Sequence, residues 1–257
     1  MNRDSITNTF VVSGLLCIIC SVLVSAAAVG LKQKQTLNKE LNQKKNILEV
    51  CEIAYTPNSI DTLFEDNIQS RLVDLRTGQY VDKTENGNLT VDTYSLKKVL
   101  QTDNTILEID PAGLGGIREN HAVVFLYPEK NQVIIPIRGR GLWSTLFGYI
   151  SLAEDASTVS GITFYDHRET PGLGGEVDNP DWKAQWTGKG AIKDGQVVIE
   201  VTKQGQVTDS SRQVDGMAGA TITTQGVHRL VRFWLGAQGF GKYLARPHKT
   251  QTAVQQQ

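Results

Sequence analysis

The chain opens with an uninterrupted apolar stretch. From Phe10 to Leu31 it holds no charged residue, and an α-helix needs about 20 apolar residues to cross the hydrocarbon core of a bilayer. A cleaved signal peptide would have a shorter apolar core with an Ala-x-Ala-like site after it, to which the alanines at 26–28 correspond only loosely. We therefore predict that the N-terminal segment 1–31 holds one retained transmembrane helix at about 10–31.

A polar stretch rich in Lys, Gln, Asn and Leu follows the apolar one. Its composition predicts a helical stalk over 32–57 that leaves the membrane, and a second helix is expected to start near Ser59. The last residues, 247–257, are polar and predict a disordered tail. The soluble domain is therefore expected to cover 58–246.

The middle of the chain consists of short runs of β-branched and aromatic residues. Such runs, bounded by turn residues, are typical of strands. The expected strands are 122–127, 132–138, 148–152, 162–165 and 197–202. Asp194-Gly195 predicts a tight hairpin turn before the last of them. These runs indicate a mostly antiparallel sheet.

Helices are expected beside this sheet. A short one is predicted around 182–186, and a longer one from Thr224 onward. The longer helix has apolar positions with helical spacing. They are Val227, Leu230, Val231, Trp234 and Leu235. Together with the strands, these helices predict an α+β fold: a single N-terminal transmembrane helix followed by a mostly antiparallel-sheet domain with flanking helices.

Charge excludes one class of function and leaves the topology open. The formal net charge is -1, which gives no case for nucleic-acid binding. Basic residues outnumber acidic ones up to position 45, so the rest of the chain is mildly acidic. Counted locally, the lysines after the apolar stretch would lie in the cytoplasm, but long domains are translocated largely regardless of charge. The sequence by itself does not decide the side of the large domain.

Cysteine and histidine give little support for a metal site. Cys17 and Cys20 form a C-x-x-C pair inside the predicted membrane helix, a spacing found in metal and redox sites. Two further ligands would be needed, and cysteine is also an ordinary small apolar residue. The four histidines have no metal-ligand spacing. We therefore predict no metal site, and no disulfide in the soluble domain, where Cys51 has no mate.

Three glycine-rich segments interrupt the strand and helix pattern, at 138–144, 169–176 and 215–224. Glycine permits positive φ angles and a close approach of the backbone to a ligand. Ordinary turns are an equally good reading of composition alone. Three such segments in one domain nevertheless suggest loops that converge on a ligand.

The third segment lies directly before the predicted long helix. Backbone N–H groups and the helix dipole favour a phosphate at such a place. Thr221 and Thr223 offer hydroxyls two residues apart, and Gly219 and Ala220 leave room for a bulky group. The alternative is that Thr223 or Thr224 is an ordinary helix cap. The residues themselves therefore indicate a phosphate site at a helix start and nothing more specific.

The sequence Asp215-Gly-Met-Ala-Gly-Ala-Thr-Ile-Thr223 resembles the flavinylation motif of the FMN-binding domain family. That family includes flavin-carrying subunits of the sodium-translocating NADH:quinone reductase and of the related Rnf electron-transport complex. In its members a flavin transferase joins the phosphate of FMN to the Thr that closes a Ser/Thr-Gly-Ala-Thr core, which here is Thr221. Ala218 departs from the usual Ser or Thr of that core. The segments Gly-Leu-Trp-Ser144 and Glu-Thr-Pro-Gly-Leu-Gly174 resemble two further signatures of the family, in the right order.

The resemblance implies roles for the residues of these segments. Thr221 would supply the phosphoester oxygen, while Gly219 and Ala220 would let the ribityl phosphate lie against the backbone. The helix after Thr223 would stabilise the phosphate charge, and Asp215 would assist flavin transfer unless it merely forms a turn. Glu169 would brace its own loop. The expected walls of the site are Trp143, Ser144, Thr170, Leu173 and Gly174, with a core aromatic as the alternative for Trp143.

The implied function is that of an electron-relay subunit with a covalent FMN, in a sodium-pumping NADH:ubiquinone oxidoreductase of the bacterial inner membrane. The large domain would be periplasmic, and the partners would be other subunits of the complex and, during maturation, a flavin transferase. The chain needs no catalytic acid, base or nucleophile. Anchor, stalk and length fit the sodium-pump member of the family better than the Rnf member. The Rnf-type relay and a non-redox anchored periplasmic module are the alternatives.

Overall fold

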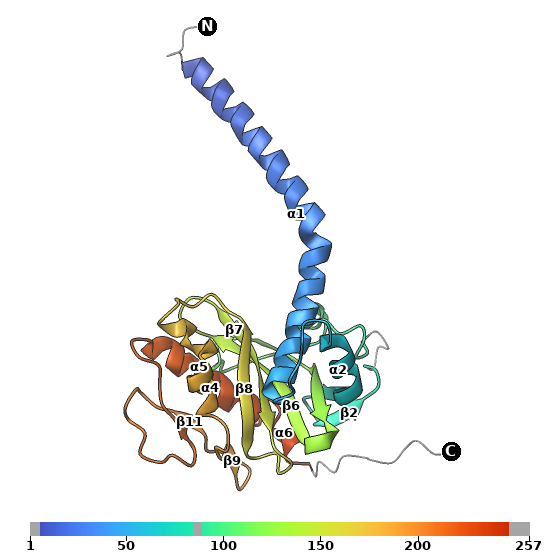
Figure 1. Cartoon of the computed structure of the whole chain (residues 1–257), viewed down its shortest axis with the longest axis vertical. Helices are drawn as coiled ribbons and strands as arrows, with labels where there is room; N and C mark the ends of the chain where they lie inside the picture. Colours follow the sequence, from blue (N-terminus) through green and yellow to red (C-terminus); the bar gives the residue numbers. More distant parts are fainter. Residues whose placement is uncertain (1–5, 85–88, 247–257) are drawn as a thin grey trace, which may run out of the picture. The chain divides into compact units, whose positions relative to one another are not determined.

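The computed structural model describes residues 6–84 and 89–246, and the chain divides into two compact units, Met1–Gln43 and Lys44–Gln257. Helix α1 (Ile6–Val50), drawn in blue in Figure 1, supplies all the described structure of the first unit. This helix is long and apolar enough to cross a membrane, and none of its most apolar window is buried. The expected N-terminal apolar helix is therefore present. The predicted disordered tail lies outside the described residues.

A six-stranded sheet forms the centre of the second unit, with the strand order β2-β1-β5-β6-β7-β8. Every neighbouring pair in it is antiparallel, as the strand pattern predicted. Its strands are β1 (Gln69–Asp74), β2 (Gln79–Val81), β5 (His121–Tyr127), β6 (Gln132–Arg140), β7 (Thr145–Leu152) and β8 (Val159–Asp166). Ile135, Ile150 and Ile162 lie side by side across three strands and are all buried, so the sheet is covered at its middle.

Helix α5 (Thr221–Leu235) packs its apolar face into the main core on one side of this sheet. Two glycines allow the close approach between the helix and strand β6. A Cβ atom at Gly139 would lie 2.5 Å from Leu230 Cβ, and one at Gly226 would lie 2.4 Å from the Arg140 carbonyl oxygen. The Trp234 indole N–H also donates to the Arg138 carbonyl at 2.6 Å. These contacts fix the position of α5 along strand β6.

Alternate residues of the strands face the other side of the sheet. There the last turns of α1, from Lys44 onward, and α2 (Ile60–Asn67) build a second core with Ile134 and Tyr149. The Thr163 hydroxyl donates to Asn46 Oδ1 at 2.9 Å. The end of α1 is thus part of the folded domain. Burial raises the pKa of the Cys51 thiol to about 12, so this cysteine acts as a small core residue.

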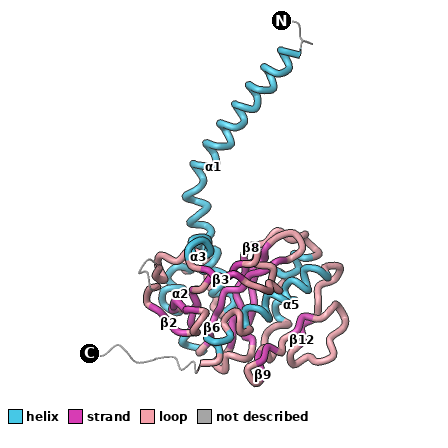
Figure 2. Tube along the Cα trace, turned by 180° about the vertical axis from the view of Figure 1, so that it is seen from behind, coloured by secondary structure: helices cyan, strands magenta, loops and turns pink. Residues whose placement is uncertain are grey.

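The remaining elements are short. They are α3 (Leu96–Thr102), β3 (Asn104–Ile106), β4 (Ile117–Glu119), η1 (Pro128–Lys130), η2 (Gly174–Asp178), α4 (Pro180–Ala184), β9 (Ile192–Lys193), β10 (Gln196–Val197), β11 (Glu200–Val201), β12 (Gln213–Val214) and α6 (Gly241–Leu244). Three small two-stranded ladders lie outside the main sheet (Figure 2). The predicted hairpin at Asp194-Gly195 is present as the antiparallel pair β9–β10.

Two predicted boundaries are wrong. The expected strand 197–202 is divided, because the backbone N–H groups of Val198 and Ile199 both turn to the Ala191 carbonyl. Its second half, β11, then pairs in parallel with β12. The long helix starts at Thr221 and not near Thr224. The prediction missed this start because the N-cap residue, Ala220, is not of a type that capping rules recognise.

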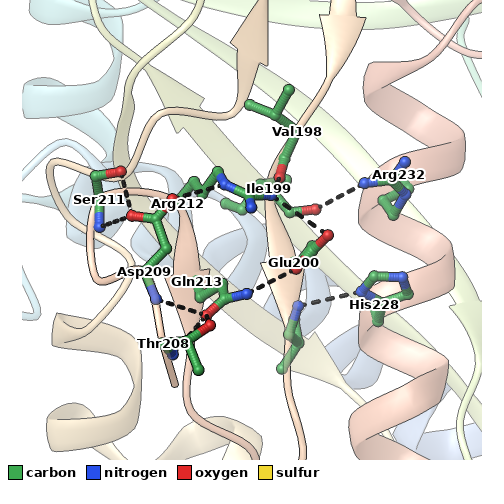
Figure 3. Close-up of polar contacts among 11 residues, drawn as sticks. Val198, Ile199, Glu200, Thr208, Asp209, Ser211, Arg212, Gln213, His228 and Arg232 are labelled. Atoms are coloured by element: carbon green, nitrogen blue, oxygen red, sulfur yellow. Dashed lines mark hydrogen bonds and ion pairs between the residues drawn. The ribbon is translucent and has the colours of Figure 1, made fainter. Parts of the chain in front are cut away.

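A polar network ties β11 to helix α5 (Figure 3). His228 Nδ1 accepts the Val201 N–H at 3.1 Å, and the Arg232 guanidinium donates to the Ile199 carbonyl at 3.1 Å. On the far side of β11, Gln213 Nε2 donates to Glu200 Oε2 at 2.9 Å. Because Gln213 belongs to β12, this network also holds β12, the strand that leads into the third glycine-rich segment.

We expect Leu48→Ala to destabilise the domain by about 2–5 kcal/mol, because Leu48 is fully buried in the core that the end of α1 forms. Denaturant unfolding of the detergent-solubilised chain, followed by tryptophan fluorescence, measures this cost. Lys45→Ala on the exposed face of the same turn is the matched control and should change little. Equal stabilities of the two variants would contradict the role of this turn in the core.

Stability should fall as the pH drops below about 6.5, in part through His228. Burial, together with Arg232 and Arg229, lowers the pKa of His228 below its ordinary 6.5, so the unfolded chain binds this proton first and stability declines with pH from there to the folded-state pKa. Melting temperatures of wild type and His228→Gln between pH 8 and pH 5 test this. Wild type should lose more stability than the variant, and parallel curves would refute the assignment.

Candidate functional site

The three glycine-rich segments meet at the carboxylate of Glu169, which is only 5% exposed. Oε1 accepts the N–H groups of Trp143 at 2.9 Å and Ser144 at 3.1 Å. Oε2 accepts the Leu142 N–H at 3.2 Å and the Thr223 hydroxyl at 2.7 Å. One side chain of the second segment therefore joins the first segment to the third. Glu169 was expected to brace its own loop, but its carboxylate also holds residues of the other two segments.

Two of the glycines are needed at this point because the carboxylate fills the space that a side chain would take. A Cβ atom at Gly141 would lie 2.6 Å from Glu169 Oε1. One at Gly174 would lie 2.7 Å from Oε2 and 2.6 Å from the Thr223 hydroxyl oxygen. The carboxylate could move aside only by giving up some of its four hydrogen bonds, so these glycines belong to the architecture of the site.

The electrostatics of the site keep Glu169 ionised. Burial alone would raise its pKa, but the hydrogen bonds from Thr223, Trp143, Ser144 and Leu142 outweigh burial and hold the pKa below its ordinary value. Four donors around one carboxylate are favourable only to the charged form. A fixed negative charge therefore lies beneath the surface that the three segments share.

His167 and Ser144 support this arrangement from the side. The Glu169 N–H donates to His167 Nδ1 at 3.2 Å, and His167 Nε2 bonds Asp178 Oδ2 at 2.8 Å. The hydrogen bond with Asp178 raises the pKa of His167. The Arg168 N–H donates to the Ser144 hydroxyl at 2.8 Å. The backbone before Glu169 is therefore anchored on both sides.

The two threonines of the third segment have different environments. Thr221 is the first residue of α5 and is exposed, whereas Thr223 is only 1% exposed. The N-cap residue Ala220 makes no side-chain cap. The alternative that Thr223 or Thr224 is the helix cap is wrong, since both lie inside the helix. Thr224 instead accepts the Met217 N–H at 3.1 Å with its hydroxyl.

Large apolar side chains are exposed around this helix start. They are Leu142, Trp143, Leu173 and Ile222. Trp143 is 65% exposed and is therefore not a core aromatic. Leu173 lies against Gly219, where a Cβ atom would be 2.9 Å from Leu173 Cδ2 and where φ is +66°. Thr170 is exposed and Gly174 is buried.

Asp215 lies on a different part of the third segment. Its carboxylate accepts the N–H groups of Gly205 at 2.7 Å and Gly216 at 3.0 Å. Its carbonyl accepts the Trp182 indole N–H at 2.9 Å. These bonds make Asp215 a turn-forming residue, and a part in flavin transfer stays a prediction.

A fourth glycine-rich loop, 110–116, borders the site and was not among the predicted segments. The Asp110 carboxylate accepts the N–H groups of Leu114 at 2.8 Å and Gly116 at 2.9 Å. The Arg140 N–H donates to the Ala112 carbonyl at 2.7 Å, so this loop supports the strand end just before the first segment. The signal that could have revealed it is Asp-Pro followed by three glycines within six residues of the Asp.

Within residues 6–84 and 89–246, no cluster of three or more His, Cys, Asp or Glu side chains could hold a metal ion. The groups that the site offers to a ligand are backbone amides at a helix start, threonine and serine hydroxyls, and exposed apolar side chains. This set suits a phosphate ester with a flat apolar ring.

The FMN-binding domain family matches residues 141–236, a range that contains all of the site residues described above except the loop 110–116. Fold and site thus define an FMN-binding domain protein with an N-terminal apolar helix. The NqrC subunit of the Na(+)-translocating NADH-quinone reductase from Vibrio anguillarum is 42% identical over 95% of this chain and 96% of its own length. Its counterpart from Vibrio parahaemolyticus is 40% identical over the same shares. The crystal structure of Shewanella oneidensis NqrC is 28% identical, with a TM-score of 0.73 over 81% of this chain and 97% of that one.

The chain belongs to the NqrC family of the Na(+)-translocating NADH-quinone reductase. It is a membrane-associated subunit of a multi-subunit oxidoreductase complex and carries an FMN-binding domain. The predicted family is confirmed, and the relatives decide against an Rnf-type relay and a non-redox module.

We expect Gly141→Ala to destabilise the domain by about 1–3 kcal/mol, because the new methyl group would displace the Glu169 carboxylate. Gly190→Ala is the matched control, since its nearest neighbour would be an oxygen at 3.8 Å. Denaturant unfolding of both variants measures the difference. A Gly141→Ala chain as stable as the control would show that the carboxylate has room to move.

Proposed function

We propose that Thr221 carries FMN as a phosphoester and that the protein relays electrons within a sodium-pumping NADH:ubiquinone oxidoreductase. The observation that carries this proposal is that Thr221 is exposed and is the first residue of α5, at a helix start that no side chain caps. The first N–H groups of a helix have no partner within it, and with the dipole they stabilise a phosphate.

Burial favours Thr221 over Thr223 as the acceptor. The Thr223 hydroxyl is buried and donates to Glu169, so a phosphate there would face an ionised carboxylate in the interior. Thr221 is exposed on the surface, where a transferase can reach it. Ala218, which departs from the family motif, is exposed as well. This departure does not change Thr221, so the acceptor hydroxyl is retained.

The surroundings of Thr221 suit the remainder of FMN. Gly219 and Ala220 let the ribityl phosphate approach the backbone, while Trp143, Leu173 and Ile222 offer apolar surface to the ring. The hydroxyls of Ser144 and Thr170 and the backbone at Gly174 are further candidate contacts. Flavin, when bound, supplies the redox chemistry, and the protein provides its binding and orientation. A covalent link suits a relay, since a cofactor that dissociated would interrupt it.

Attachment requires a flavin transferase and an activated flavin nucleotide. The Thr221 oxygen forms a bond to the flavin phosphorus, the hydroxyl proton leaves, and the bond from phosphorus to the leaving group breaks. Asp215, near the acceptor in sequence, is our candidate for an aid to this transfer. Helix α1 anchors the chain in the bacterial inner membrane, the large domain is periplasmic, and the other subunits of the complex are its redox partners.

Expression with a periplasmic flavin transferase tests the proposal. The denatured wild-type chain should show in-gel flavin fluorescence, and mass spectrometry should find FMN less one water on the peptide with Thr221. Thr221→Ala should lose the fluorescence entirely, while Thr223→Ala, the matched control two residues away, should keep it. Flavin on any residue other than Thr221 would sink the assignment.

A further inference from the structure

The side chain of Glu169 is the hydrogen-bonded connection between the turn that carries Trp143 and the helix that begins at Thr221. On one side it receives three consecutive backbone N–H groups, at 142–144. On the other it receives the hydroxyl of Thr223, in the first turn of α5. The turn itself is closed by the Gly141 N–H and the Ser144 carbonyl at 2.8 Å.

Besides the carboxylate, the turn is held at its base by the paired strands β6 and β7 and by the bond from the Arg168 N–H to the Ser144 hydroxyl. The side chains of Leu142 and Trp143 are exposed, so burial in the core does not fix them. Their position follows from the backbone bonds to the carboxylate. Hydrogen bonds to an ionised acceptor are shorter and stronger than those between neutral groups.

A carboxylate is suited to this task and an amide is not. Each oxygen of Glu169 accepts two donors. A glutamine has one acceptor oxygen and one NH₂ donor, so in either orientation its NH₂ group would face at least one backbone N–H of the turn. The negative charge and the two acceptors are both required.

We propose that Glu169 is a positioning residue of the flavin site, which sets the orientation of the flavin ring without touching it. This inference rests on the proposed attachment at Thr221. A phosphoester there fixes one end of FMN, but the ribityl chain is flexible. The ring at the other end takes its orientation from the exposed surface of the Trp143 turn, whose place relative to α5 is set by Glu169.

The first test needs no flavin. The full chain, purified in detergent from cells without a flavin transferase, is compared as wild type, Glu169→Gln and Glu176→Gln by hydrogen–deuterium exchange. Glu176 is the matched control, because it lies in the same loop and accepts a single side-chain bond, from Asn179 at 2.6 Å. Exchange at 142–144 should be about tenfold faster in Glu169→Gln alone. Equal exchange in all three chains overturns the proposal.

The second test uses the flavinylated chain. Glu169→Gln should keep its covalent flavin but lose visible circular dichroism and gain flavin fluorescence, because the ring is no longer held against the Trp143 turn. Thr223→Val, which removes one of the four bonds, should lie between this variant and wild type, and Thr223→Ser should restore the wild-type signal. Unchanged flavin spectra in Glu169→Gln, despite faster exchange at 142–144, would reduce Glu169 to a structural residue and overturn the proposal.

The two tests separate the possible failures. A wild-type chain that carries no flavin on Thr221 overturns the proposed function, and the positioning role falls with it. The exchange experiment would then still show whether Glu169 orders the turn. A wild-type chain with flavin on Thr221 and no change of spectra on substitution at Glu169 overturns the positioning role alone.

Discussion

The packing of helix α5 against strand β6 determines where the candidate site lies. The contact is close because Gly139 and Gly226 remove the side chains that would keep the two backbones apart. Trp234 then bonds the Arg138 carbonyl, which fixes the helix along the strand. With the body of α5 buried, its first residues are held at the end of the sheet, beside the turn that follows β6. The Glu169 carboxylate occupies the junction between them.

Much of the framework could be predicted from the sequence because it depends on local pattern. The charge-free stretch before Lys32 is long enough for a spanning helix, and the spacing of Val227, Leu230 and Trp234 defines the buried face of α5. The strands of the antiparallel centre follow from runs of β-branched residues. Even the meeting of three glycine-rich segments was a fair expectation from their number. The proposed attachment of FMN to Thr221, in contrast, depends on a resemblance and not on a physical pattern.

The details of the site could not be predicted, because they depend on contacts between residues far apart in the chain. Glu169 accepts a hydrogen bond from Thr223, which is 54 residues away, and no local sequence pattern near either residue indicates this contact. The break in the expected strand 197–202 depends on the distant Ala191 carbonyl. The exposure of Trp143 is equally non-local, since the sequence left both a wall of the site and a core position open for it. Capping rules do not predict the helix start at Thr221, because its N-cap residue, Ala220, makes no side-chain cap.

The bonds around Glu169 also bear on the order of events in biogenesis. The four donors to this carboxylate are all groups of the chain itself, so these bonds need no cofactor to form. If Thr221 carries FMN as proposed, its exposed side chain would be available for modification on the folded domain.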